Sequence, residues 1–423
     1  MQIKLEYGTT GLTLDVPKGC QAKVVDIKSV EPLADPRQAV VESLEDPIEA
    51  RPLAELAKGC EAPCIVVSDM TRAVPNKIIL PPILDALRSA GIERDRITIL
   101  IGTGLHRPMT DDEITEMLGE DIVGKYRIVN HFAKDLDTNI RLGETSRGTP
   151  IWLDKTYVQS DLRILTGLVE PHVMAGYSGG PKAVGIGLSY YEAIRGLHAP
   201  KVMEDECTEA GMMEGNLLQH DFREITAKAS PDFIVNVTLN RGMKTTGVFS
   251  GEMTQAHQRA IEFIESYSRV EVDRRFDVVV TTNGGAPLDI NFYQCIKGML
   301  TAARIVKNRG TIVMAAKCPE GLGSDEFAEL MTQFECPKEA MEMLMHPNFF
   351  VIDQWGVEMI CKAMRQAEVL FYSEGIAEEI LKRCLVTPIS SVNEGLRLAL
   401  EKHGGQAEVA VIPKGPYIVA EVR

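Results

Sequence analysis

Two histidines in this chain occupy positions where acid/base chemistry is common. His106 and His172 each follow a short apolar segment that is typical of a strand, in "RITILIG" (96–102) and "DLRILTGLVE" (161–170). An imidazole changes its protonation state near neutral pH, so two of them on either side of a substrate can act as general base and general acid. A third histidine, His198, follows the helix-like stretch "SYYEAIRG".

The stretch around His172, "EPHVMAGYSGGPKAVGIG" (170–187), combines glycines with a lysine, Lys182. A phosphate-binding P-loop requires Gly directly before Lys and Ser or Thr directly after it, and Pro181 and Ala183 stand there instead. No G-x-G-x-x-G dinucleotide fingerprint is present either. Glycines allow positive φ or a close approach to the backbone, and an ordinary tight turn remains an alternative explanation for Gly179 and Gly180.

Basic and polar residues add two candidate binding sites. Arg72 follows the strand-like "CIVVSD" (64–69), and its guanidinium can hold a carboxylate or phosphate through two hydrogen bonds. Further along, "NFYQCIKGM" (291–299) brings Gln294 and Lys297 within one helical turn. This second segment is either a solvated helix start or an anion-binding site.

No standard zinc motif is present, because the sequence lacks HExxH, a CxxC pair and a His-rich tract. The closest cysteines, Cys60 and Cys64, are more simply explained by chance placement at the end of a helix. A metal would therefore need ligands from distant segments or from a group that is not protein.

The elements that position these residues alternate between strand and helix. Strand-like segments at 64–69, 96–102 and 161–170 are separated by amphipathic helical segments, which predicts an α/β fold with mainly parallel sheets. Open parallel sheets bind ligands beyond the carboxyl ends of their strands. We expect an N-terminal α/β domain over 1–270 and a C-terminal one over 271–423, with the active site in the cleft between them. The final strand can return to the first domain.

Composition narrows the class of protein further. The chain has 423 residues, 45% of them hydrophobic and 25% charged, which excludes disordered and collagen-like classes. Its net charge of −15 disfavours nucleic-acid or membrane partners, because both are polyanions. Nine cysteines without paired spacing and an N-terminus without a signal peptide predict a cytoplasmic protein.

Several segments together resemble the lactate racemase family, in the family's order and over most of the chain. They are "DMTRAVP" (69–75), "GTGLHRPMT" (102–110), "EPHVMAGYSGGPKAV" (170–184), "YYEAIRGLH" (190–198), "YQCIKGM" (293–299) and "DQWG" (353–356). Two departures stand out, because Val184 to Gly187 omit a proline common in the family and Leu217 replaces another.

The resemblance implies a nickel-pincer nucleotide, nickel pyridinium-3,5-bisthiocarboxylic acid mononucleotide, covalently attached at Lys182. His198 would be the one protein ligand to nickel, since the nucleotide supplies two sulfurs and a carbon. His106 and His172 would be the catalytic acid/base pair. The remaining implied positions are Asp69, Thr71, Gly179 and Gly180 for the cofactor, and Arg72, Tyr293, Gln294, Lys297 and Trp355 for the substrate.

The implied activity is racemisation or epimerisation at C2 of a 2-hydroxy acid. In the family mechanism, one histidine takes the hydroxyl proton while hydride passes to the cofactor and then returns to either face of the planar keto acid. Enzymes that mature the cofactor would be partners. An aldonate 2-epimerase on the same scaffold is the alternative, and a non-catalytic nucleotide- or anion-binding protein is a third reading.

Overall fold

The computed structural model describes residues 1–346 and 349–423, and these form two compact units. The histidine unit comprises residues 29–198 and 212–267, and it contains His106, His172 and His198. The three-segment unit comprises residues 1–28, 199–211 and 268–423. The first segment of this unit precedes the histidine unit in sequence, the second interrupts it and the third follows it.

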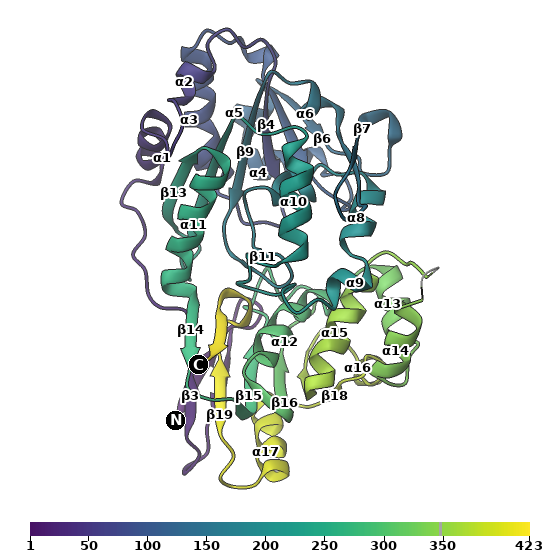
Figure 1. Cartoon of the computed structure of the whole chain (residues 1–423). Helices are drawn as coiled ribbons and strands as arrows, with labels where there is room; N and C mark the ends of the chain where they lie inside the picture. The colour runs from purple at the N-terminus through teal and green to yellow at the C-terminus, as the bar shows by residue number, and fades with distance from the viewer. Residues whose placement is uncertain (347–348) are drawn as a thin grey trace. The chain divides into compact units, whose positions relative to one another are not determined.

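The histidine unit is built on a six-stranded sheet in the order β13-β12-β9-β4-β5-β6, which Figure 1 shows with helices packed around it. All neighbouring strands are parallel except β13, which is antiparallel to β12. The strands are β4 (Pro63–Ser68), β5 (Thr98–Gly102), β6 (Arg127–Asn130), β9 (Leu162–Leu168), β12 (Phe233–Leu239) and β13 (Thr245–Gly251). The parallel α/β arrangement predicted from the sequence is confirmed.

The helices and smaller elements of this unit connect and cover the sheet. The helices are α1 (Pro36–Glu45), α2 (Leu53–Leu56), α3 (Asn76–Ser89), α4 (Asp111–Leu118), α5 (Glu120–Val123), α6 (Lys155–Gln159), α7 (Lys182–Gly185), α8 (Tyr191–Leu197), α10 (Leu217–Ala227) and α11 (Met253–Ser268, whose last residue belongs to the other unit). Two antiparallel hairpins, β7 (Asn139–Glu144) with β8 (Pro150–Asp154) and β10 (Pro171–His172) with β11 (Gly176–Tyr177), complete it, with short 3-10 turns at Arg94–Arg96 and Leu136–Thr138.

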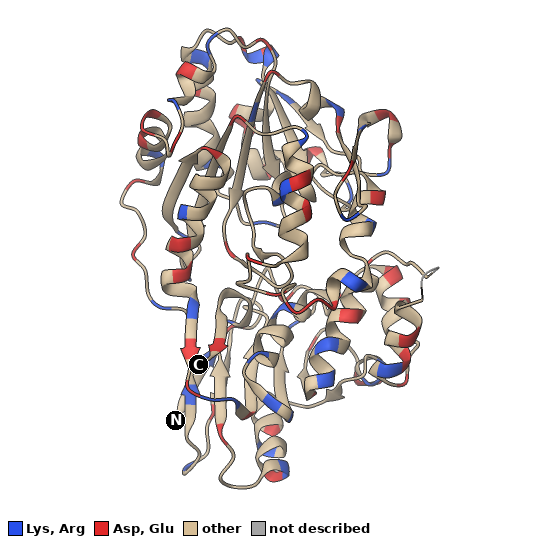
Figure 2. Ribbon diagram, in the orientation of Figure 1, with Lys and Arg blue, Asp and Glu red and all other residues tan. Residues whose placement is uncertain are grey.

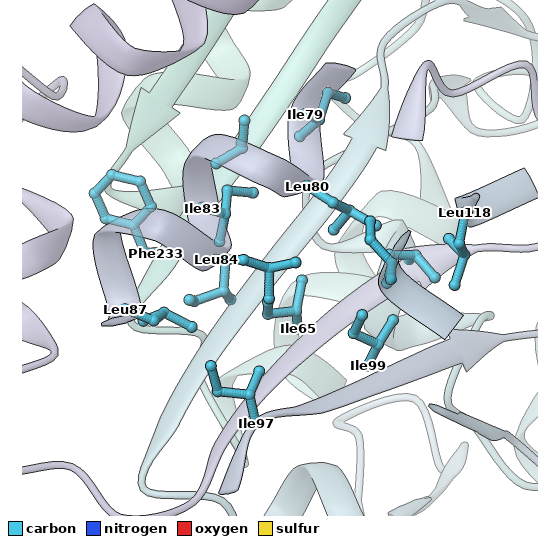
Figure 3. Packing of buried hydrophobic residues seen from close by; sticks show 14 of the residues in the cluster. Ile65, Ile79, Leu80, Ile83, Leu84, Leu87, Ile97, Ile99, Leu118 and Phe233 are labelled. Atoms are coloured by element: carbon cyan, nitrogen blue, oxygen red, sulfur yellow. The ribbon is translucent and has the colours of Figure 1, made fainter. Parts of the chain in front are cut away.

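One face of this sheet packs against α3, as Figure 3 shows. Ile83 and Leu84 of α3 belong to the same buried cluster as Ile65 of β4 and Ile99 of β5. Strands buried on both faces read as continuous apolar runs, which explains why "CIVV" and "ITILI" lack polar alternation. This core fixes the strand ends from which the site residues project.

The three-segment unit contains a second six-stranded sheet, fully parallel, in the order β18-β17-β16-β15-β19-β3. Its strands are β3 (Ala22–Val24), β15 (Phe276–Thr282), β16 (Val306–Ala315), β17 (Ala367–Tyr372), β18 (Thr387–Pro388) and β19 (Val409–Ile412). The final strand, β20 (Val419–Val422), pairs with β14 (Arg269–Val272) within this unit. It does not return to the histidine unit, because its ladder partner directly precedes β15.

The expected N-terminal hairpin around "GTTG" is present as β1 (Gln2–Leu5) and β2 (Leu12–Asp15). The helices of this unit are α9 (Pro200–Met203), α12 (Ile296–Ala303), α13 (Asp325–Met331), α14 (Pro337–Leu344), α15 (Gln354–Gln366), α16 (Glu378–Arg383) and α17 (Val392–His403), with 3-10 turns at Tyr293–Cys295 and Gly415–Tyr417. Figure 2 shows Lys and Arg interspersed with Asp and Glu along the helices. Among the described residues, no helix is long and apolar enough to cross a membrane.

Candidate functional site

The residues that follow three neighbouring strands line one pocket of the histidine unit. Because β9, β4 and β5 are parallel neighbours, their carboxyl ends meet at the same edge of the sheet. The empty space there, including its part open to solvent, is about 650 Å³. The lining residues most relevant to chemistry are Asp69, Thr71, Arg72, His106, Gly179 and Lys182.

Asp69 and His106 form a hydrogen-bonded pair in this pocket. Oδ2 of Asp69 lies 2.6 Å from Nδ1 of His106, and Oδ1 accepts hydrogen bonds from the hydroxyl and the backbone N–H of Thr71 at 2.6 and 3.1 Å. Burial alone would raise the pKa of Asp69, but the bonds to His106 and Thr71 outweigh it and place that pKa below its ordinary value. The carboxylate is therefore ionised and accepts a hydrogen bond from Nδ1–H, so the lone pair of a neutral His106 ring lies on Nε2.

Arg72 is already paired with a carboxylate of its own unit. Its Nη1 donates to Oε1 of Glu170 at 2.9 Å. The Glu170 backbone N–H donates in turn to Oγ of Ser178, which donates to the carbonyl of Leu168. Sequence reasoning missed Glu170, although its place directly after a strand was a signal. One of the five N–H donors of Arg72 is thus used in the bond to Glu170, which positions the guanidinium group.

The loop that leads to Lys182 is held by two side chains that sequence reasoning also missed. Gly180 N donates to Oδ1 of Asn236 on β12 at 3.0 Å, and Nε2 of His257 on α11 donates to the carbonyl of Ser178 at 2.9 Å. His257 lies on the buried face of an amphipathic helix. A histidine among the apolar positions of such a helix could have indicated from the sequence that its ring has a buried partner.

The glycines of this loop are required by protein packing. Gly179 and Gly180 have φ of +79° and +49°, and a Cβ on Gly180 would overlap the imidazole of His257. Gly179 lines the pocket, whereas Gly180 falls outside the set of described residues that line it. The contact with His257 gives one reason for a glycine at position 180, and its expected role beside the cofactor stays a prediction.

His172 lies in the two-residue strand β10, next to the turn of the hairpin with β11. The side chain is buried, and its Nδ1 accepts hydrogen bonds from the backbone N–H groups of Ala175 at 3.1 Å and Met174 at 3.4 Å. Like Gly180, His172 falls outside the described lining of the pocket. The hairpin connects it to Glu170, which holds Arg72.

His198 ends α8 and is buried. Burial lowers its pKa to about 4, with a further contribution from the positive charge of Lys182 and an opposing one from its bond to the carbonyl of Ile194. Nδ1 of His198 lies 2.9 Å from the carbonyl oxygen of Ile194. A carbonyl only accepts hydrogen bonds, so Nδ1 carries the proton of the neutral ring. Nε2 then carries the lone pair, the state in which an imidazole binds a metal. In the part of the chain that the structure describes, no group of three or more His, Cys, Asp or Glu side chains could hold a metal ion.

The four site residues predicted beyond residue 290 all belong to the three-segment unit. The structure brings two of them together, since Nε1 of Trp355 donates to the hydroxyl of Tyr293 at 2.7 Å. Gln294 lies in the same 3-10 turn as Tyr293, and Lys297 lies in the first turn of α12. The predicted positions thus form a local group around one turn of this unit.

Comparison with known proteins gives concordant results over most of the chain. A family model described as the lactate racemase N-terminal domain matches residues 7–211, and one described as the lactate racemase C-terminal domain matches residues 272–420. A lactate racemase from Lactiplantibacillus plantarum is 33% identical over 388 residues, or 91% of each chain. One from Thermoanaerobacterium thermosaccharolyticum is 29% identical over 99% of this chain and 98% of its own.

A solved structure is similar along its whole length. The lactate racemase apoprotein from Thermoanaerobacterium thermosaccharolyticum superimposes with a TM-score of 0.94 and 29% identity, covering 99% of this chain and 100% of that one.

Proposed function

Because the chain belongs to the lactate racemase family and is an isomerase, we propose that it inverts C2 of a 2-hydroxy acid with a nickel-pincer nucleotide attached at Lys182. The observation that carries this proposal is the pocket in which the Asp69–His106 pair, Arg72 and Lys182 lie together. A base, a carboxylate-binding cation and an amine for covalent attachment are the groups that this chemistry needs.

The residues present fit such a cofactor. Lys182 lines the pocket, and its charge acts on His198, which is neutral with its lone pair on Nε2. The nucleotide would supply the other ligands of the nickel ion, so the single imidazole of His198 would be sufficient from the protein. Lys182 and His198 would hold the group, and when bound it supplies a centre that accepts a hydride from C2 and returns it.

The side chains of the pocket have separate roles in this proposal. Nε2 of His106 takes the hydroxyl proton, while Asp69 holds its ring and stabilises the imidazolium that results. Arg72 binds the substrate carboxylate through N–H groups not used by Glu170. His172 is the second member of the acid/base pair, and Tyr293, Gln294, Lys297 and Trp355 add contacts to the substrate.

The experiment is a comparison of protein produced with and without the cofactor-maturation enzymes. We expect the matured protein to contain nickel and to carry a mass increment on the peptide with Lys182, and we expect Lys182→Arg to lack that increment while folding normally. Lys125→Arg, on the surface, is the matched control. Matured protein without nickel or the increment would refute the cofactor assignment.

The substrate is tested separately, with a panel of single enantiomers of lactate, malate, phenyllactate and gluconate followed by optical rotation. Lactate is the first candidate because both curated relatives are named lactate racemases. The second candidate is an aldonate, whose additional hydroxyl groups could donate to the hydroxyl oxygens of Ser68 and Thr71 in the pocket lining. Inversion of gluconate in preference to lactate would select the second.

A further inference from the structure

His106 and His172 make different hydrogen bonds at Nδ1, and this difference determines which ring nitrogen carries the proton. At His106, Nδ1 lies 2.6 Å from Oδ2 of Asp69. An ionised carboxylate only accepts hydrogen bonds, so Nδ1 must be the donor. A neutral imidazole has one proton, and Nε2 of His106 therefore carries a lone pair.

At His172 the order is reversed. Nδ1 faces the backbone N–H groups of Ala175 and Met174, at 3.1 and 3.4 Å, and an N–H only donates. Nδ1 must therefore carry the lone pair, and Nε2 carries the proton. A proton on Nδ1 would leave the buried N–H of Ala175 unsatisfied, at a cost of roughly 1–3 kcal/mol. Roughly 1.4 kcal/mol already corresponds to a tenfold preference, so one tautomer dominates.

We propose that His106 and His172 are held as opposite neutral tautomers, with the lone pair on Nε2 of His106 and the proton on Nε2 of His172. The use of these groups on a substrate rests on the proposed function, whereas the tautomers are properties of the chain alone. The hydrogen bonds that fix the two tautomers differ in origin. Asp69 reaches His106 from a neighbouring strand end, while His172 is held by backbone groups of its own hairpin turn.

This assignment makes the two enantiomers unequal in the first turnover. For the enantiomer whose hydroxyl reaches His106, the O–H bond breaks and an N–H bond forms at Nε2 of His106 without prior change. The product oxygen then takes a proton from solvent, and His106 returns its own proton to solvent. For the other, Nε2 of His172 must first lose its proton and Nδ1 gain one, which breaks the bonds from Met174 and Ala175. Enantiomers have equal free energy, so steady-state kcat/KM must be equal in both directions. The effect of the tautomer change should therefore appear as a difference between the two enantiomers in kcat and in KM, each measured separately.

The test is nitrogen-15 NMR of the full chain labelled only at histidine, without cofactor, near pH 7.5. One-bond coupling to hydrogen identifies the protonated ring nitrogen, and His106→Gln and His172→Gln assign the two signals. His198 and His257 serve as internal standards, because burial lowers the pKa of each to about 4 and their carbonyl partners fix Nδ1–H and Nε2–H respectively. We expect His106 to match His198 and His172 to match His257.

A further variant tests whether the two tautomers are fixed independently. Asp69→Ala should convert His106 to a mixture of tautomers and leave His172 unchanged. The inference is overturned if wild-type His172 is protonated at Nδ1, or if both histidines show the same tautomer. Opposite tautomers in a matured protein that inverts no 2-hydroxy acid would refute the proposed function while leaving this inference intact.

Discussion

At the scale of single residues, the site depends on side chains that orient others. Asp69 is buried and ionised, and its two oxygens hold His106 and Thr71. Glu170 does the same for Arg72. Both carboxylates act through a partner, so their replacement should affect the reaction more than the stability of the chain.

Asp69→Asn should reduce kcat by about 10²-fold or more, because an amide can donate to His106 and so allow the wrong tautomer. Steady-state kinetics of the matured enzyme measures this, with Asp121→Asn at an exposed ion pair as control. An unchanged kcat would contradict the role of Asp69.

Glu170→Gln should raise KM several-fold with a smaller change in kcat, because a neutral partner holds the guanidinium of Arg72 less firmly while leaving the base in place. Initial rates over a range of substrate concentrations distinguish the two parameters. A fall in kcat at constant KM would instead assign Glu170 to the chemical step.

At the scale of elements, the loop before Lys182 is positioned by β12 and α11. Asn236 and His257 contact it, and the positive φ of Gly179 and Gly180 lets the chain turn into α7. The arrangement makes two predictions, one about glycine and one about pH.

Gly180→Ala should destabilise the protein more than Gly148→Ala. Both glycines have positive φ, at +49° and +84°, but only a Cβ at 180 meets a side chain, while nothing lies within 4 Å of one at 148. The shared backbone strain costs roughly 1–2 kcal/mol, and overlap with His257 adds to it at 180. Urea unfolding of both variants measures the difference, and equal losses would contradict the packing role of His257.

Stability should fall as the pH drops below about 6.5, because burial lowers the pKa of His257 and His198 from 6.5 to about 4. Between these values the unfolded chain binds protons that the folded chain does not, so the stabilisation is present above pH 6.5 and is lost progressively toward pH 4. Each histidine should account for about 2 kcal/mol between pH 7 and pH 5. His257→Gln should flatten the decline in urea unfolding, and an unchanged slope would contradict its burial as a neutral ring.

At the scale of the whole molecule, the three-segment unit is completed by residues distant in sequence. β3 pairs with β19, and the N-terminal hairpin packs Leu5, Tyr7 and Leu14 into the same buried cluster as Val280 of β15. The N-terminus is therefore part of the fold of residues 268–423.

Leu14→Ala should cost about 2–5 kcal/mol, because the side chain is fully buried. The loss should appear in the unfolding of the three-segment unit and leave that of the histidine unit unchanged. Hydrogen exchange followed by peptide mass spectrometry resolves the two units, with Met345→Ala, at an exposed residue of the same unit, as control. Equal loss of protection in both units would contradict this assignment.

The sequence alone determined the fold class and most of the strands, because buried parallel strands leave continuous apolar runs between amphipathic helices. It also predicted that Asp69, Arg72 and His106, which follow two of these strands, lie at one edge of the sheet, and they line one pocket there. The role of Lys182 was implied by the family resemblance. Only the tertiary structure decided which groups touch them. Glu170, Asn236 and His257 act through hydrogen bonds between segments up to 98 residues apart, and no local pattern encodes such pairings. The opposite tautomers of His106 and His172 were likewise invisible in the sequence, because each depends on the single atom that faces Nδ1 in the folded chain.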